Sequence, residues 1–145
     1  MHILQSMSVK KSYQYCTSFY KMTPRELNTA WSSYDFHYEI LCNLQEQNDE
    51  IMLEYHNFIN NNLNPSKKDI LKFKNKINSS YDALIVGYEK CLYAIEELIN
   101  ANEKCSNVPP EREIDSQYLC EYKNLTWTQY EVAKIEQDEI NEVLN

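Results

Sequence analysis

Two helix start signals constrain what this chain can fold into more than any other feature of its sequence. Thr23-Pro24-Arg25-Glu26 and Ser66-Lys67-Lys68-Asp69 each place a hydroxyl residue three positions before an acid. Such a hydroxyl accepts a hydrogen bond from a first-turn N–H, and the acid suits the positive end of the helix. Pro65 lacks an N–H and disfavours helical geometry at Asn64, so the first helix must end near there.

Apolar side chains recur three or four residues apart after both signals, which predicts amphipathic helices at about 24–63 and 67–105. A third helix is predicted at about 111–143, with Asp115 or Ser116 as its cap or with its start at Pro110. The predicted fold is all-α. An elongated antiparallel hairpin is completed by the third helix, giving a three- to four-helix bundle with coiled-coil-like packing over residues 23–145.

The N-terminal segment, residues 1–22, is less well determined by its pattern. Val9, Tyr13, Cys16 and Phe19 fit a short helix, whereas the alternation of Tyr13 with Tyr15 equally fits a strand or an ordered loop.

The only glycine, Gly87, lies within the apolar run 83–88 of the second predicted helix. Glycine inside a helix costs about 1 kcal/mol relative to alanine, and close approach by another helix would justify it. The same run is apolar nearly all round, so some of Ile85, Val86 and Tyr88 should face outward. These residues are candidates for a protein interface, and the excess of apolar surface predicts self-association.

The net charge is −8 and is unevenly distributed. Residues 1–22 have three lysines and no acid; residues 23–65 have seven acids and one arginine (−6), and residues 107–145 have nine acids and three basic residues (−6). Without a basic face the chain is a poor ligand for nucleic acid or anionic membrane. The lysine cluster at 67–76 should pair with Asp49, Glu50 and Glu54 across the hairpin.

Five cysteines occur with no CxxC motif, so reduced thiols are the default expectation. No apolar stretch is long enough for a membrane span or a signal peptide, which predicts no membrane insertion. The expected location is the cytoplasm, or the host-cell cytoplasm for a viral protein or secreted effector.

No grouping of residues suggests catalysis. His2, His37 and His56 lie far apart, and no cluster of Cys, His and acids has metal-ligand spacing. The cysteines have no evident activating neighbour. We therefore expect a non-enzymatic protein with no cofactor and no metal site; an enzyme whose site is assembled between subunits is the weaker alternative.

Aromatic residues gather near the start of the first helix, at Trp31, Tyr34 and Phe36, and on the third helix, at Trp127 and Tyr130. They would either pack together inside the bundle or serve as exposed anchors, because aromatic residues are enriched among interface hot spots. The predicted function is a protein interaction module that presents a rigid helical surface, as an adaptor, scaffold or subunit of a homo- or hetero-oligomer. The alternative is an acidic inhibitor, immunity protein or secretion-type chaperone that covers a specific target.

Overall fold

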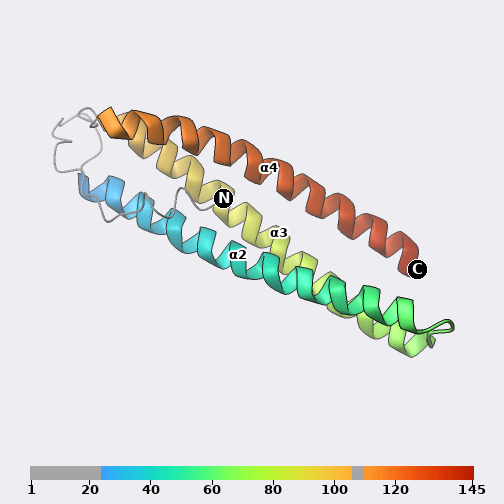
Figure 1. Ribbon diagram of the computed structural model, residues 1–145. Coiled ribbons are helices and arrows are strands. Elements are labelled where there is room, and N and C mark those ends of the chain that lie inside the picture. Colours follow the sequence, from blue (N-terminus) through green and yellow to red (C-terminus); the bar gives the residue numbers. More distant parts are fainter. Residues whose placement is uncertain (1–23, 106–109) are drawn as a thin grey trace.

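A computed structural model describes residues 24–105 and 110–145, and these form three long helices (Figure 1). Helix α2 spans Pro24–Asn61, α3 spans Lys67–Lys104 and α4 spans Pro110–Leu144. The predicted all-α fold is confirmed, and every predicted helix end falls within two residues of the observed one. Thr23 and the N-terminal segment lie outside the described residues. In the described ranges, no helix combines the length and apolar character that crossing a membrane requires.

The second start signal works as its sequence predicts. Ser66 is the N-cap of α3, and its hydroxyl accepts a hydrogen bond from the backbone N–H of Asp69 at 3.1 Å. Helix α4 begins at Pro110, so the proline start is the right one of the predicted alternatives and neither Asp115 nor Ser116 is the cap. Proline suits the first helical position because its missing N–H would have no partner there.

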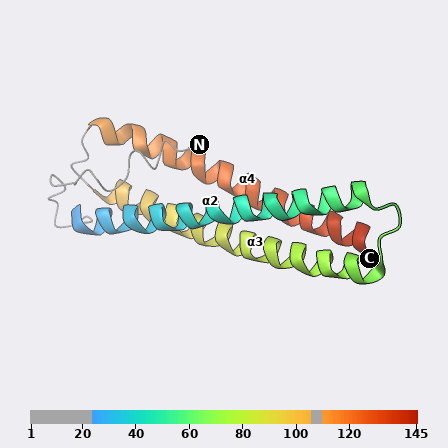
Figure 2. The ribbon, with the colours of Figure 1, turned by 60° about the horizontal axis from the view of Figure 1, so that its bottom comes forward.

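Helix α3 is the central element of the bundle. It packs along both α2 and α4, running antiparallel to each, whereas α2 and α4 have little direct contact (Figures 1 and 2). The two outer helices therefore meet α3 along two separate seams, and these seams differ in chemistry.

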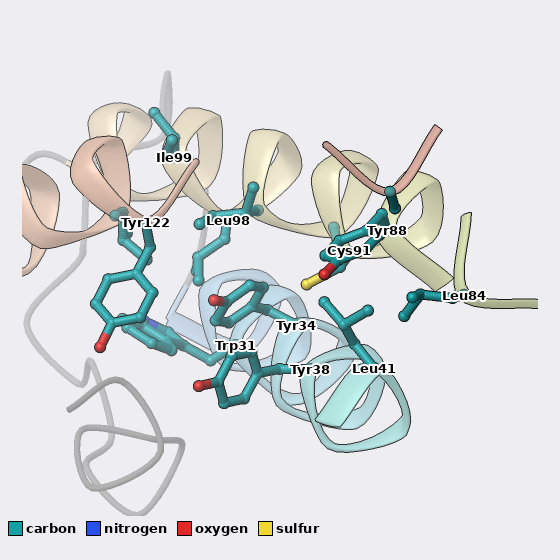
Figure 3. Close-up of a cluster of buried hydrophobic side chains, with 14 of the residues drawn as sticks. Trp31, Tyr34, Tyr38, Leu41, Leu84, Tyr88, Cys91, Leu98, Ile99 and Tyr122 are labelled. Carbon is teal, nitrogen blue, oxygen red and sulfur yellow. The ribbon is translucent and has the colours of Figure 1, made fainter. Parts of the chain in front are cut away.

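The α2–α3 seam is mainly apolar and aromatic. Trp31, Tyr34 and Tyr38 of α2 lie against Leu98 and Cys91 of α3, as Figure 3 shows. Tyr122 of α4 joins this cluster close to Trp31. Further along the seam, Leu41 and Leu84 continue the buried stripe.

Gly87 of α3 lies directly against leucine side chains of α2. A Cβ atom added to Gly87 would stand 2.7 Å from Leu44 Cδ1 and 3.5 Å from Leu41 Cδ1. Carbon atoms prefer separations of about 3.5–4.0 Å, so any side chain here would displace Leu44. The prediction that a neighbouring helix justifies this glycine is confirmed.

The α3–α4 seam contains hydrogen bonds between polar side chains. Asn78 of α3 exchanges hydrogen bonds with Asn141 of α4, at 2.8 and 2.9 Å, and its amide oxygen also accepts from Gln137. Gln137 donates a further bond to Asp82 at 2.8 Å. Asn102 donates to Ser116 near the other end of the seam. Such paired amides fix the alignment of two helices, because any slip would leave half-buried polar groups without partners.

The thiols differ from expectation at one position. Cys42, Cys91 and Cys120 are free, but Cys105, at the C-terminal end of α3, is disulfide-bonded. The expectation that all thiols are reduced is therefore wrong for Cys105. Cys91 is a buried core residue, as expected for a small apolar side chain, and burial raises the pKa of its thiol to about 12.

Candidate protein interface

Three of the proposed interface residues are in the core and not on the surface. Trp31 and Tyr34 are fully buried, and Tyr88 is nearly so. Tyr88 accepts a hydrogen bond from Gln45 Nε2 at 2.9 Å, and burial raises the pKa of the Tyr34 hydroxyl. These side chains lie on the faces by which α2 and α3 pack, so they stabilise the fold and are not exposed anchors.

Three other candidates are exposed. Phe36 is 61 % accessible, Trp127 54 % and Val86 46 %. Ile85 and Tyr130 are half-buried at the edges of the α3–α4 seam. Trp127 does not pack with Trp31 inside the bundle, as one interpretation of the sequence had it; its ring lies 5.6 Å from that of Tyr130.

A further exposed aromatic residue, Tyr93, is 68 % accessible and was not among the predicted candidates. The signal for it was present in the sequence. Tyr93 lies off the inward stripe of α3, so the helical pattern leaves it outside the core, and a hydrogen bond with Glu97, four residues on in the same helix, raises the pKa of its hydroxyl.

Two contacts across the α3–α4 seam place Tyr93 opposite Trp127. The Tyr130 hydroxyl donates to a Glu89 carboxylate oxygen at 3.0 Å, and Lys123 forms an ion pair with Glu96. Tyr93 lies between Glu89 and Glu96 on one strip of α3, because residues three and four apart share a helix face. Trp127 lies between Lys123 and Tyr130 on α4 in the same way. The two aromatic side chains therefore occupy facing positions on the same exposed side.

Contacts across the α2–α3 seam bring Phe36 to the same level. Lys76 and Glu54 form an ion pair at 2.7 Å on the exposed side of this seam. Phe36 precedes Glu54 by about five full turns, so it projects to the same side of α2. Helix α3 runs antiparallel to α2, so the same distance along α3 from Lys76 ends at the turn that contains Tyr93. Tyr93 therefore lies at the level of Phe36.

Phe36, Tyr93 and Trp127 thus come from the three helices and lie at about one level of the bundle, and Val86 lies two turns from Tyr93 along α3. We call these four residues the aromatic face. The partly exposed Ile40 of α2 lies one turn from Phe36 and extends it. Two hollows in the α2–α3 surface flank it, of about 730 Å³ beside Ser33 and about 460 Å³ beside Leu44.

Charged groups of both signs surround the aromatic face. The Lys134 ammonium lies 4.3 Å from the centre of the Tyr130 ring and 3.3 Å from the Glu131 carboxylate. Together with the Lys123–Glu96 pair these groups form a polar rim around apolar anchors, which is the usual arrangement of a protein–protein interface.

Within 24–105 and 110–145, no three His, Cys, Asp or Glu side chains are grouped so that they could hold a metal ion. Comparison of the chain with protein-family models, with curated proteins and with solved structures finds no match. The aromatic face therefore has to be interpreted from its own geometry.

Proposed function

We propose that this protein is a non-enzymatic interaction module that binds a protein partner through the aromatic face. The observation that carries the proposal is that Phe36, Tyr93 and Trp127, one from each helix, are all exposed and lie at about one level of the bundle. None of the three is needed to fill the core. Exposed apolar groups of this kind, gathered on one face and rimmed by charges, usually mark interfaces.

An adaptor or assembly role is better supported than acidic inhibition or mimicry. An acidic inhibitor would need a continuous negative face, whereas here basic groups alternate with acids. Lys76 pairs with Glu54, Lys123 with Glu96 and Lys134 with Glu131. Of the pairing expected between the lysine cluster and Asp49, Glu50 and Glu54, the structure has the Lys76–Glu54 bridge. Such exposed pairs contribute little stability, but they reduce the negative electrostatic potential at the aromatic face.

Two triple variants test the proposal. In the first variant, Phe36, Tyr93 and Trp127 are each changed to Ser. In the second, the matched control, three exposed leucines that lie outside the aromatic face are changed to Ser: Leu53, Leu63 and Leu71. Both should retain helical circular dichroism and unfold in urea at nearly the wild-type concentration, because exposed side chains contribute little to stability.

Binding is measured for all three proteins by proximity labelling in the source organism and by sedimentation velocity over a concentration series. The first variant should lose its partner, or its self-association if the partner is a second copy, while the control keeps it. Equal binding by both variants would contradict the proposal. Unfolding of the first variant alone would show that the aromatic face is structural.

A further inference from the structure

An open cavity lies between α2 and α4, on a side of the bundle that the aromatic face does not use. Because the two helices have little direct contact, about 370 Å³ remains between them, with Leu84 and Tyr88 of α3 as the floor. Val132 lines the α4 wall and is 47 % accessible. It lies five residues from Trp127, which is about 140° around the helix. The cavity therefore has a largely apolar floor and is separate from the aromatic face.

Two carboxylates line this cavity from opposite walls, Asp49 on α2 and Glu136 on α4. Burial raises the pKa of the Tyr81 hydroxyl and of the Tyr88 hydroxyl, and the negative charges of both acids raise each pKa further. Neither carboxylate forms an ion pair with another described residue, and the described residues that line the cavity include no basic one. A cationic group between the two walls would therefore be attracted by both charges.

The walls restrict the form that an occupant can take. Helices satisfy their backbone groups internally, so an extended peptide over the apolar floor would find no partners for its own N–H and C=O groups. A helix satisfies those groups itself and inserts side chains from one face. The lining runs from Thr128 to Glu136, about 12 Å along α4, which is about two helical turns. Two apolar side chains four residues apart on an incoming helix match this length.

We propose that this cavity docks a basic amphipathic helix of a partner protein, which places two apolar side chains on the floor and lysine or arginine beside Asp49 and Glu136. Charge complementarity favours this occupant over an acidic or a purely apolar one. The incoming helix would be the fourth of the bundle, in the position that α2 and α4 leave open. The apolar surface extends beyond the cavity, since Leu125, seven residues before Val132, is partly exposed on the same side of α4.

Binding of a designed peptide to the full chain tests the proposal. The probe is a fluorescently labelled, alanine-based helical peptide with two leucines four residues apart and lysines flanking them, and the control peptide has glutamate in place of every lysine. Fluorescence anisotropy at low salt should show saturable binding of the lysine peptide alone, weakened several-fold by added salt. Equal binding of both peptides, or no saturation by about 1 mM of the lysine peptide, would overturn the proposal.

Charge variants test whether the two wall acids recognise the lysines. Asp49→Asn combined with Glu136→Gln should weaken binding of the lysine peptide at least about fivefold. Glu50→Gln combined with Asp138→Asn is the matched control, because it changes the net charge equally at exposed positions of the same helices that do not line the cavity. The control should bind like the wild type. Equal weakening in both double variants would mean that the peptide responds to net charge alone, and would overturn the proposal.

Substitutions on α4 test the place of docking. Val132→Arg, on the cavity wall, should abolish binding of the lysine peptide, whereas Ile135→Arg, at an exposed position outside the cavity, should not. Both variants should retain the circular dichroism of the wild type, because both side chains are exposed. The triple Ser variant of the aromatic face should bind the peptide normally, so this proposal and the preceding one can fail separately.

The chain without peptide tests the other possible occupants. Sedimentation velocity should give the same oligomeric state for Val132→Arg as for the wild type. A wild-type dimer that Val132→Arg converts to monomers would assign the cavity to a second copy. Benzoylphenylalanine at position 132 should link to the lysine peptide when it is present. A link to another segment of the same chain in its place would mean that the chain fills its own cavity, and either of these results would overturn the proposal.

Discussion

Gly87 gives the sharpest test of the packing between α2 and α3. Replacing glycine by alanine inside a helix normally stabilises it by about 1 kcal/mol. Here the new methyl group would stand 2.7 Å from Leu44 Cδ1, which is too close. Leu44 is half-buried, so it can move, and forcing a side chain off its preferred rotamer costs about 0.5–1.5 kcal/mol. The two effects nearly cancel, and Gly87→Ala should change the free energy of unfolding by less than about 1 kcal/mol.

A double-mutant cycle separates the two effects. Leu44→Ala removes the atom that the new methyl group would meet, at a cost of about 1–2 kcal/mol, below the range for fully buried leucines. In that background Gly87→Ala should stabilise by the full helix-propensity term of about 1 kcal/mol. The expected coupling between the two positions is therefore about 1 kcal/mol.

Urea unfolding followed by far-UV circular dichroism measures all four proteins of the cycle. Asn100→Ala, an exposed α3 substitution on a turn remote from Leu44, is the control and should have the same small effect in both backgrounds. Additive effects of Gly87→Ala and Leu44→Ala would refute the steric explanation. A loss of more than about 2 kcal/mol for Gly87→Ala in both backgrounds would refute it too, because the obstacle would then be something other than Leu44.

Two further properties follow from the seams and the core. Asn78→Ala should lower the free energy of unfolding by about 1–3 kcal/mol, because Asn141 and Gln137 lose hydrogen-bond partners in the α3–α4 seam. In the same urea experiment, Asn75→Ala, at an exposed position of α3, is the control and should change the free energy of unfolding little. Stability should also fall at alkaline pH: burial raises the pKa of Tyr81 and of Cys91 to about 12, from 10.0 and 9.0, so their contribution is intact below pH 9 and is lost progressively as pH rises toward 12. A urea midpoint that stays constant from pH 8 to pH 11.5 would contradict this.

The helices could be predicted because each boundary has a local cause. Ser66 caps α3, Pro65 limits the preceding helix, and Pro110 starts α4. The role of Gly87 could also be inferred, since a lone glycine in an apolar helical run needs a close neighbour. The disulfide at Cys105 could not, because pairing depends on which thiols the fold brings together and not on their spacing in the chain.

The aromatic face could be predicted only in part. The sequence offers Phe36, Val86 and Trp127 together with Trp31 and Tyr34 as candidates, and the structure buries the last two. The helical periodicity of the sequence does not show how the three helices are aligned with one another. That alignment decides which residues of different helices meet, as Lys76 meets Glu54 and Tyr130 meets Glu89, and no local signal encodes such pairs.

The two seams of α3 give the aromatic face its rigidity. The α2–α3 seam is held mainly by buried aromatic and aliphatic side chains. The Asn48–Ser80 and Gln45–Tyr88 hydrogen bonds and the close fit of Leu44 against Gly87 add alignment. The α3–α4 seam uses paired amides, which add modest free energy each but are lost together if α4 slips. Trp127 belongs to α4, so its position opposite Tyr93 depends on those amides. A partner that recognises all three helices would thus bind only the correctly aligned bundle, which lets a thin structure present a specific surface.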